Sequence, residues 1–259
     1  AIILIIVVLM AIFGPMMCKY SYAEQNMSLR NASPSMDHWF GTDRMGRDIF
    51  VRILFGARIS LAVGCLAAVI NLIVGTIYGG IAGYVGGKVD MVMMRIVDII
   101  YSVPAMLYIV LIMLIFGASV ISIMLGISIT CWIDMARIVR QQVKSLKEQE
   151  FTMAAFVLGA SPSRILIKHL LINTMGQIIV TVTLMVPQAI FTEAWLSFLG
   201  VGISAPMASW GTLAQDARQV IMTYPMQTVY PMIAICITIF SFNFVGEGLE
   251  KALDPKRKR

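Results

Sequence analysis

Residues 144–173 read KSLKEQEFTMAAFVLGASPSRILIKHLLIN, the longest polar interruption between two long apolar runs in the second half of the chain. One helical face, with the spacing i, i+3, i+4 and i+7, is occupied by Phe151, Ala154, Ala155 and Leu158. Gly159 follows where a left-handed residue would end that helix. Ser161 and Pro162 then suit the N-cap and first position of a second helix. The stretch therefore predicts a helix, a glycine corner and another helix.

The first of these helices has a face of small residues. Ala154 and Ala155 are adjacent in the sequence and would let another surface approach closely. A short amphipathic helix of this kind between two membrane spans is typical of a docking element. An ordinary helical hairpin loop is the plain alternative. A soluble DNA-reading helix-turn-helix is less favoured, because both ends run directly into apolar spans.

The whole chain is strongly apolar. Its 259 residues are 59% hydrophobic and 13% charged, with a mean hydropathy of +0.84. Soluble domains have about 45–50% apolar and about 25% charged residues. The composition therefore predicts an all-α membrane protein that crosses the bilayer several times. The net charge of +6 needs no nucleic acid, because Lys and Arg gather on cytoplasmic loops of membrane proteins and face anionic lipid.

Apolar runs of about 20 residues mark membrane helices, and six are expected. Their ranges are 2–18, 59–82, 91–116, 120–138, 175–198 and 229–246. The domain division that follows is a first transmembrane helix at 1–18, an extracytoplasmic loop at 19–58, a transmembrane domain at 59–250 containing the loop 144–173, and a cytoplasmic basic tail at 251–259. The chain starts inside an apolar run, so we expect a segment before Ala1. No A-x-A-like cleavage site follows, so we expect the first run to be retained as a span.

The positive-inside rule orients these spans. With both termini in the cytoplasm, inner loops carry thirteen of the 20 Lys and Arg residues and outer loops seven. The first outer loop is unusually basic. Its end, roughly residues 48–58, is amphipathic, with apolar side chains set against Arg52, Arg58 and the adjacent Arg47. This predicts a helix that lies on the outer membrane surface and leads into the second span.

Three acidic residues fall within or beside the spans. Asp98 lies three residues after Arg95, and Asp134 lies three before Arg137, so each pair can meet on one helix face. An ion pair is favoured over a proton relay in both cases. Glu193 has no nearby cation in sequence. It is therefore a candidate pathway or gate residue, with a hydrogen bond to a neighbouring helix as the equal alternative.

Two prolines inside spans, Pro104 and Pro187, join Glu193 as candidate pathway or gate positions, because proline frees a backbone carbonyl and can kink a helix.

Few residues of the sequence are candidates for catalysis. The sequence has two histidines and no HExxH, GxSxG, Walker A or GxGxxG motif. The four cysteines lie in or beside apolar runs without a CxxC pair. We therefore expect no catalytic residue, no metal site and no ATP site on this chain.

The stretch 144–173 resembles the cytoplasmic EAA loop of ABC-transporter permeases. Ala154, Ala155 and Gly159 match that motif, whereas Met153 replaces its Glu and Ile172 replaces its Pro. In the family this loop carries a coupling helix that docks on the ATP-hydrolysing subunit. The resemblance implies that the residues coupling this chain to an ATPase are Phe151, Ala154, Ala155, Leu158, Gly159, Ala160, Ser161 and Ile165.

The resemblance extends over nearly all of the chain from His38. The segments HWFGTDRMGRDIFVRILFGARISLAVG (38–64), AGYVGGKVDMVMMRIVD (82–98) and TEAWLSFLGVG (192–202), with the later SWG (209–211), the region of Asn243 and ALDP (252–255), are similar to the C-type permease subunit of the dipeptide/oligopeptide/nickel branch. Together these segments are specific for that type of subunit, although any one of them alone would be weak evidence for it.

That resemblance implies the type I importer permease fold, in a bacterial or archaeal cytoplasmic membrane. It implies four kinds of partner: a homologous second permease, two ATPase subunits holding ATP and Mg, an extracytoplasmic substrate-binding protein, and membrane lipid. The implied function is half of a translocation pathway for short peptides. A nickel importer of the same branch is the nearest alternative. A stand-alone secondary transporter is a different class, which should show an inverted repeat and more paired charges within the membrane.

Overall fold

The computed structural model describes residues 1–253, and within that range the named elements are all helices. In chain order they are α1 (Ile2–Met17), η1 (Met27–Leu29), α2 (Ile49–Val85), α3 (Gly87–Ser102), α4 (Ala105–Phe116), α5 (Val120–Lys147), α6 (Glu150–Val157), α7 (Pro162–Arg164), η2 (Ile165–Leu171, a π-helix), α8 (Ile172–Phe198), α9 (Trp210–Arg218) and α10 (Met226–Leu253). The predicted all-α architecture is confirmed.

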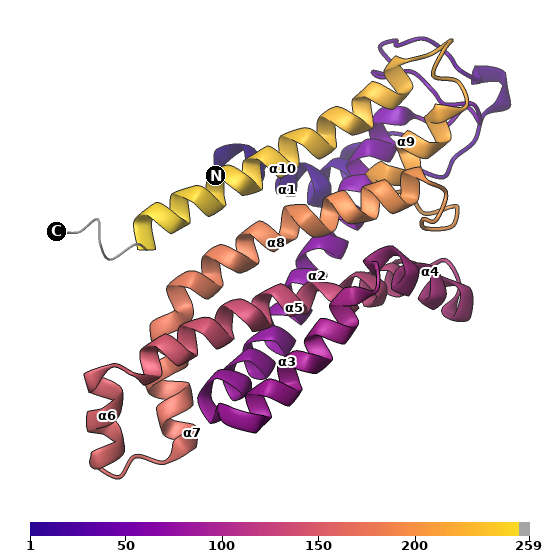
Figure 1. The fold of residues 1–259 in the computed structure, drawn as a ribbon. Helices are drawn as coiled ribbons and strands as arrows, with labels where there is room; N and C mark the ends of the chain where they lie inside the picture. Colours follow the sequence, from indigo (N-terminus) through magenta and orange to yellow (C-terminus); the bar gives the residue numbers. More distant parts are fainter. Residues whose placement is uncertain (254–259) are drawn as a thin grey trace.

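Helix α2 lies at the centre and packs most extensively on α5, with α8 against both (Figure 1). Glycines on α2 make the close contact with α5 possible. A Cβ added at Gly75 would lie 2.6 Å from the Cβ of Met135, and one at Gly83 would lie 2.7 Å from the carbonyl oxygen of Arg140. The glycine-rich end of the second apolar run is therefore a helix-packing surface, as small residues are in membrane bundles.

The elongated bundle has two different ends (Figure 1). Helices α6 and α7 lie at one end, which we call the α6 end, together with the C-terminus of α5. The loop of residues 18–48 and helix α9 lie at the opposite end, which we call the α9 end. Helix α10 runs from the α9 end toward the α6 end. The predicted basic tail falls mostly on residues 254–259, which lie outside the described residues.

Two expected elements differ in the structure. The separate surface helix predicted at residues 48–58 is wrong, because these residues form the first turns of the single long helix α2, and Arg52 is buried among them. The continuous third span predicted at 91–116 is also wrong. Its chain breaks at Val103 and Pro104, where α3 and α4 meet at a bend of 78°. Proline lacks an amide hydrogen and disfavours a helical residue before it, so it favours a break at this point.

Four described helices are long and apolar enough to cross a membrane: Ile49–Val85, Val120–Lys147, Pro162–Phe198 and Met226–Leu253. The bent pair α3 and α4 makes a fifth if it is counted as one span. Helix α1 is apolar but has only 16 residues. The number of six spans stays a prediction.

Candidate functional site

Helix α6 is tied to the end of α5 by the buried residue Thr152. Its hydroxyl donates to the carbonyl of Leu146 at 2.8 Å, and its amide donates to the carbonyl of Gln149 at 3.0 Å. These bonds fix the chain where it leaves α5 and enters α6. The sequence pattern did not indicate Thr152, because its hydroxyl bonds to a carbonyl of the preceding helix and not to its own helix end.

The predicted glycine corner is confirmed. Gly159 has φ +80°, in the left-handed region. The amide of Gly159 donates to the carbonyl of Phe156 at 3.0 Å, and that of Ala160 donates to the carbonyl of Ala155 at 3.1 Å. This is the Schellman arrangement, which satisfies carbonyls left free at a helix end. Ser161 is the N-cap of α7, although its side chain makes no capping hydrogen bond within residues 1–253.

The two adjacent alanines of α6 do not form one outward face. Ala155 is 8% exposed and packs within the chain, in a cluster that includes Ile165 and Leu170, whereas Ala154 is exposed. Residues 154 and 155 are separated by about 100° around a helix, so Ala155 faces the bundle while Ala154 faces away from it. Ala155 and Ile165 therefore hold α6 on the bundle and are corrected from docking residues to internal packing residues.

The outward side of α6 is instead formed by larger apolar side chains. Leu158 and Val157 are 85% and 83% exposed, and Phe156 is 72% exposed. We call the exposed apolar set of this element the α6 surface, and it consists of Phe151, Met153, Phe156, Val157 and Leu158. A contiguous apolar patch on an otherwise solvated helix marks an interaction site. The run of apolar residues after Ala155 was the sequence signal for it.

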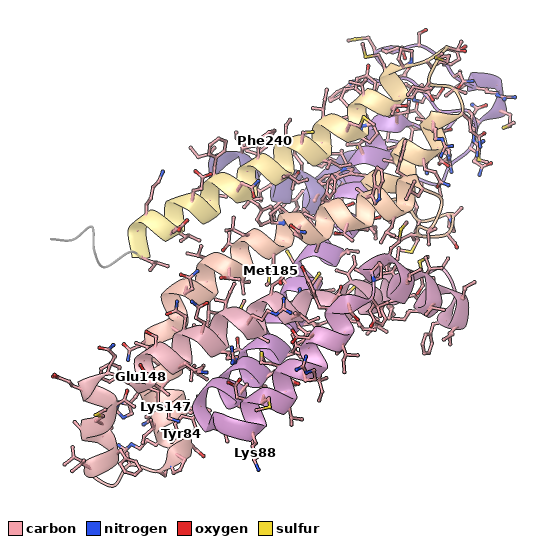
Figure 2. The ribbon with its side chains drawn as sticks, in the orientation of Figure 1. Tyr84, Lys88, Lys147, Glu148, Met185 and Phe240 are labelled. Carbon is pink, nitrogen blue, oxygen red and sulfur yellow. The ribbon has the colours of Figure 1, made fainter. Side chains whose placement is uncertain are left out.

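Ionic contacts link α3 to α5 near the α6 end. Asp90 is buried and pairs with Arg140, whose Nη2 lies 2.6 Å from it, and with Lys144 at 3.2 Å. Lys147 donates to the carbonyl of Tyr84 at 2.6 Å and lies over its ring, where Figure 2 labels both residues. These three cations of α5 therefore hold the C-terminal part of α5, from which α6 follows, against α2 and α3.

The predicted ion pairs within single helices are wrong. Arg137 pairs with Asp98 across the α3–α5 contact at 3.0 Å, and among the residues described neither Arg95 nor Asp134 forms an ion pair. The i, i+3 spacing made both local pairs possible, but packing of α3 beside α5 offered Arg137 a partner on the other helix. Asp134 has no ion-pair partner among residues 1–253.

Glu193 is fully buried and connects three elements. Its carboxylate accepts hydrogen bonds from Ser209 at the start of α9 (2.6 Å), Ser197 of α8 (2.7 Å) and Ser60 of α2 (3.2 Å). Of the two roles left open by the sequence, the hydrogen-bonded one is therefore the one observed here. Ser209 also caps α9 through a capping box with Thr212.

The two candidate prolines lie in different surroundings. Pro104 stands at the break between α3 and α4, where it is the N-cap of α4 and is exposed. Pro187 is buried inside α8, which runs through it. Only Pro104 changes the course of its span, and it lines a cavity between α4, α5 and α8.

A charge cluster holds the α9 end together. Asp43 accepts from Arg47 at 2.7 Å and from Arg52 at 2.6 Å, and Asp216 of α9 lies 3.0 Å and 3.2 Å from the same two arginines. Burial would raise the pKa of Asp43, but the charges of Arg52 and Arg47 outweigh it and lower that pKa below the ordinary value of 3.8. Two of the cations near the end of the loop predicted to be outside, Arg47 and Arg52, are thus paired with carboxylates of the same chain.

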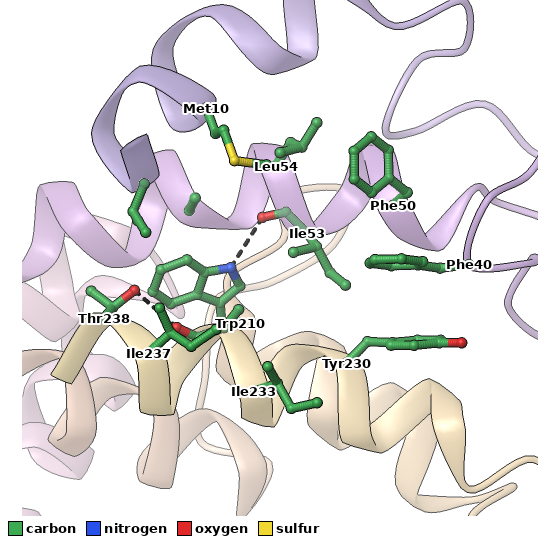
Figure 3. A pocket seen from close by; sticks show the side chains of 13 residues that line it. Met10, Phe40, Phe50, Ile53, Leu54, Trp210, Tyr230, Ile233, Ile237 and Thr238 are labelled. Atoms are coloured by element: carbon green, nitrogen blue, oxygen red, sulfur yellow. Dashed lines mark hydrogen bonds between the residues drawn. The ribbon is translucent and has the colours of Figure 1, made fainter. Parts of the chain in front are cut away.

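The same end holds an apolar pocket of about 420 Å³ between α1, α2 and α10 (Figure 3). Trp210 forms one wall, and its indole nitrogen donates to the carbonyl of Ile53 at 3.0 Å. Phe40 stacks on Tyr230 beside it, with ring centroids 4.3 Å apart. The hydrogen bond of Trp210 therefore anchors α9 against α2.

The histidines and acids form no metal centre in the described range. His38 is buried, its Nδ1 donates to the carboxylate of Asp48 at 2.7 Å, and its ring stacks on Tyr20. His169 lies on η2, away from any such group. Within residues 1–253 no three His, Cys, Asp or Glu side chains are placed to hold a metal ion.

Two family models match this chain. Residues 75–259 match the binding-protein-dependent transport system inner membrane component, and residues 1–34 match the N-terminal transmembrane domain of oligopeptide transport permease C. Together they cover both ends of the chain and the region of α6.

Curated relatives are similar in sequence to this chain over almost its full length. The oligopeptide transport system permease of Bacillus subtilis is 51% identical, over 100% of this chain and 85% of the relative. The dipeptide transport system permease of the same organism is 47% identical, over 99% and 81%. The oligopeptide permease of Escherichia coli is 43% identical, over 98% and 85%.

Among solved structures, an inward-facing form of the MetNI methionine ABC transporter is similar with a TM-score of 0.62. The similarity covers 80% of this chain and 96% of that one, at 17% sequence identity. At this identity the likeness concerns the fold alone.

Proposed function

This chain belongs to the family of binding-protein-dependent transport system inner membrane components, and on that premise we propose that it is the permease subunit that forms half of the pathway of an ATP-driven importer of short peptides. Its relatives are permeases of oligopeptide and dipeptide systems. They favour peptides over the nickel alternative, and the family favours an ATP-driven system over a stand-alone secondary transporter.

The observation that carries the proposal is the α6 surface. It places five apolar side chains outward at one end of the bundle, on a helix braced by Thr152 and by the Schellman corner at Gly159. An ATPase subunit that moves on nucleotide binding can bias the permease only through a rigid contact. We therefore propose that α6 is the coupling helix and that Phe156, Val157 and Leu158 lie at the centre of its contact.

The chain is a membrane permease and not itself a catalyst, so ATP hydrolysis belongs to partner subunits of the system. We propose a complex of this chain with a homologous second permease, two ATPase subunits that hold ATP and Mg, and an extracytoplasmic substrate-binding protein. The family is defined by dependence on a binding protein, which supports that last partner. The exposed apolar sides of the long helices support a second permease and lipid around them.

The chain is a multi-pass inner membrane permease. We propose that its α6 end faces the cytoplasm with both termini, and that its α9 end faces outward. The cations of 137–168 gather at the α6 end, as the positive-inside rule requires. The loops assigned to the α9 end carry seven Lys and Arg residues against thirteen on the loops assigned to the cytoplasm, so the count favours this orientation.

The function is tested by uptake into proteoliposomes that contain the assembled complex and external binding protein. Labelled tripeptide should accumulate only with ATP inside, and unlabelled tripeptide should compete whereas Ni²⁺ should not. Uptake driven by a proton gradient without ATP would contradict the proposal and favour a secondary transporter. Competition by Ni²⁺ alone would favour the nickel alternative.

A further inference from the structure

A cavity of about 440 Å³ opens where α3 breaks into α4 and is bounded by α5 and α8. Its volume is within the range of small-molecule sites, about 300–1,000 Å³. Polar and aromatic groups among its lining residues are Tyr101, Thr130, Asp134, Gln188 and Thr192. Ile109 and Ile127 also line it. The lining therefore combines polar and apolar side chains.

Asp134 is the charged group of this cavity and lies within the apolar run 120–138 of helix α5. It stands four residues, about 6 Å, before the end of that run at 1.5 Å per residue. A carboxylate inside an apolar run is costly and normally faces a partner or a pathway. No cation of the described chain pairs with it and no side chain there donates a hydrogen bond to it.

The nearest basic residue along α5 is already occupied. Arg137 pairs with Asp98 at 3.0 Å and lies over the ring of Tyr101, 4.6 Å from its centroid. The cavity lining contains no Lys or Arg. Among the described residues, the carboxylate of Asp134 is therefore a negative charge in this lining without a balancing cation.

The neighbouring polar groups can add hydrogen bonds to such a cation. The hydroxyl of Thr192 donates to the carbonyl of Gln188 at 2.8 Å, which leaves the lone pairs of that hydroxyl free to accept. The side-chain amide of Gln188 has no hydrogen-bond partner among residues 1–253. An ammonium group has three donors and no acceptor, so a carboxylate, a hydroxyl and an amide oxygen match it.

We propose that this cavity receives the N-terminal ammonium group of the transported peptide, with Asp134 as its counter-ion. The inference rests on the proposed peptide function and names the substrate group that this chain contacts. The first side chain of the peptide lies against Ile109 and Ile127. The peptide carboxylate has no basic partner in this cavity and is not held there, which suits a site of passage.

The test uses a tripeptide with a free amino terminus and a photoreactive diazirine side chain on its first residue. The probe is added to the assembled complex with its binding protein, irradiated, and the crosslinked residues are mapped by mass spectrometry. We expect label between Ile127 and Asp134 and between Gln188 and Thr192. Asp134→Asn should reduce that label about tenfold at equal loading of the binding protein, because a charged partner is removed, and Asp134→Glu should restore most of it.

A matched pair on α8 controls for general perturbation of the helix. Thr183, like Thr192, donates its hydroxyl to its own helix at 2.8 Å, but it does not line the cavity. Thr192→Val should lower the label and Thr183→Val should leave it unchanged. Equal effects of the two would contradict the inference.

The outcomes also separate this inference from the proposed function. If the peptide stimulates ATP hydrolysis by the wild-type complex but the label falls elsewhere, the cavity assignment is wrong and the importer stands. If Asp134→Asn instead releases the second permease, Asp134 pairs with that subunit and the inference is overturned. Absence of any peptide stimulation would overturn both.

Discussion

Gly159 sets the direction of the chain where it leaves α6, the helix that we propose contacts the ATPase. Its φ of +80° lies in the left-handed region, which costs a residue with a Cβ roughly 1–2 kcal/mol. An added Cβ would meet no atom of the described chain within 4 Å. A substitution at Gly159 therefore acts through backbone strain and not through crowding.

We expect Gly159→Val to uncouple the permease while leaving membrane insertion intact. Strain of the size given above shifts the corner away from its observed form by roughly 5- to 30-fold. Peptide-stimulated ATP hydrolysis in proteoliposomes should fall accordingly. Gly248→Val is the matched control, since Gly248 also has open space around its Cβ position but lies in ordinary helical backbone. Normal stimulation in Gly159→Val would count against the coupling role of α6.

The protonation state of Asp43 makes the stability of the α9 end depend on pH. Its folded-state pKa is below the ordinary value of 3.8, so its charged form stabilises folding at higher pH. This contribution is lost as the pH falls through the folded-state pKa. We expect Asp43→Asn to lower the thermal midpoint of the purified chain by roughly 5 °C at pH 7. The difference in thermal midpoint between Asp43→Asn and wild type should become smaller below pH 3.8. A difference that stays the same at all pH values would refute the assignment.

At the scale of elements, α6 illustrates what the sequence could and could not predict. Its helical character, its glycine corner and the following helix were all expected from the spacing of Phe151, Gly159 and Pro162, since these signals are local. Which face points outward depends on how α6 packs on α5 and η2. That is why Ala155 and Ile165 were assigned to docking although they are buried, and why Phe156 was missed.

The α6 surface should be required for contact with the ATPase but not for folding. Phe156→Ser and Leu158→Ser remove exposed apolar groups, and we expect each to reduce recovery of the ATPase subunits with the tagged chain by about tenfold, as loss of a central interface side chain does. Thermal stability of the chain alone should change little. Met222→Ser is the control, because Met222 is 96% exposed at the α9 end. Undiminished recovery with both variants would place the contact elsewhere.

Glu193 joins α2, α8 and α9, and we expect it to act in packing. Glu193→Leu leaves three serine hydroxyls without their acceptor and should lower the thermal midpoint by several degrees. Glu193→Gln should cost less, because an amide oxygen still accepts and the rotatable hydroxyls can adapt. An unchanged midpoint for Glu193→Leu together with reduced transport would assign the carboxylate to the pathway instead.

At the scale of the whole molecule, the two ends of the helix bundle differ. The α6 end carries the exposed α6 surface, and the α9 end carries the buried charge cluster around Asp43. Local apolar runs predicted most spans, because burial in lipid demands length and hydrophobicity of each helix separately. The break at Pro104, the single long α2 and the Arg137–Asp98 pair were not predicted, since each depends on how helices pack on one another. Similarly, the cavity around Asp134 draws its walls from α4, α5 and α8, which no local pattern connects.

We propose that this chain works as the membrane half of an ATP-driven complex joined through α6. Purification of the tagged chain from its native membrane in mild detergent, with identification and quantification of the proteins that accompany it, tests this directly. We expect a second, homologous permease and ATPase subunits, with recovery of the ATPase reduced by Phe156→Ser. Recovery of the chain alone, or as a homo-oligomer without an ATPase, would contradict it.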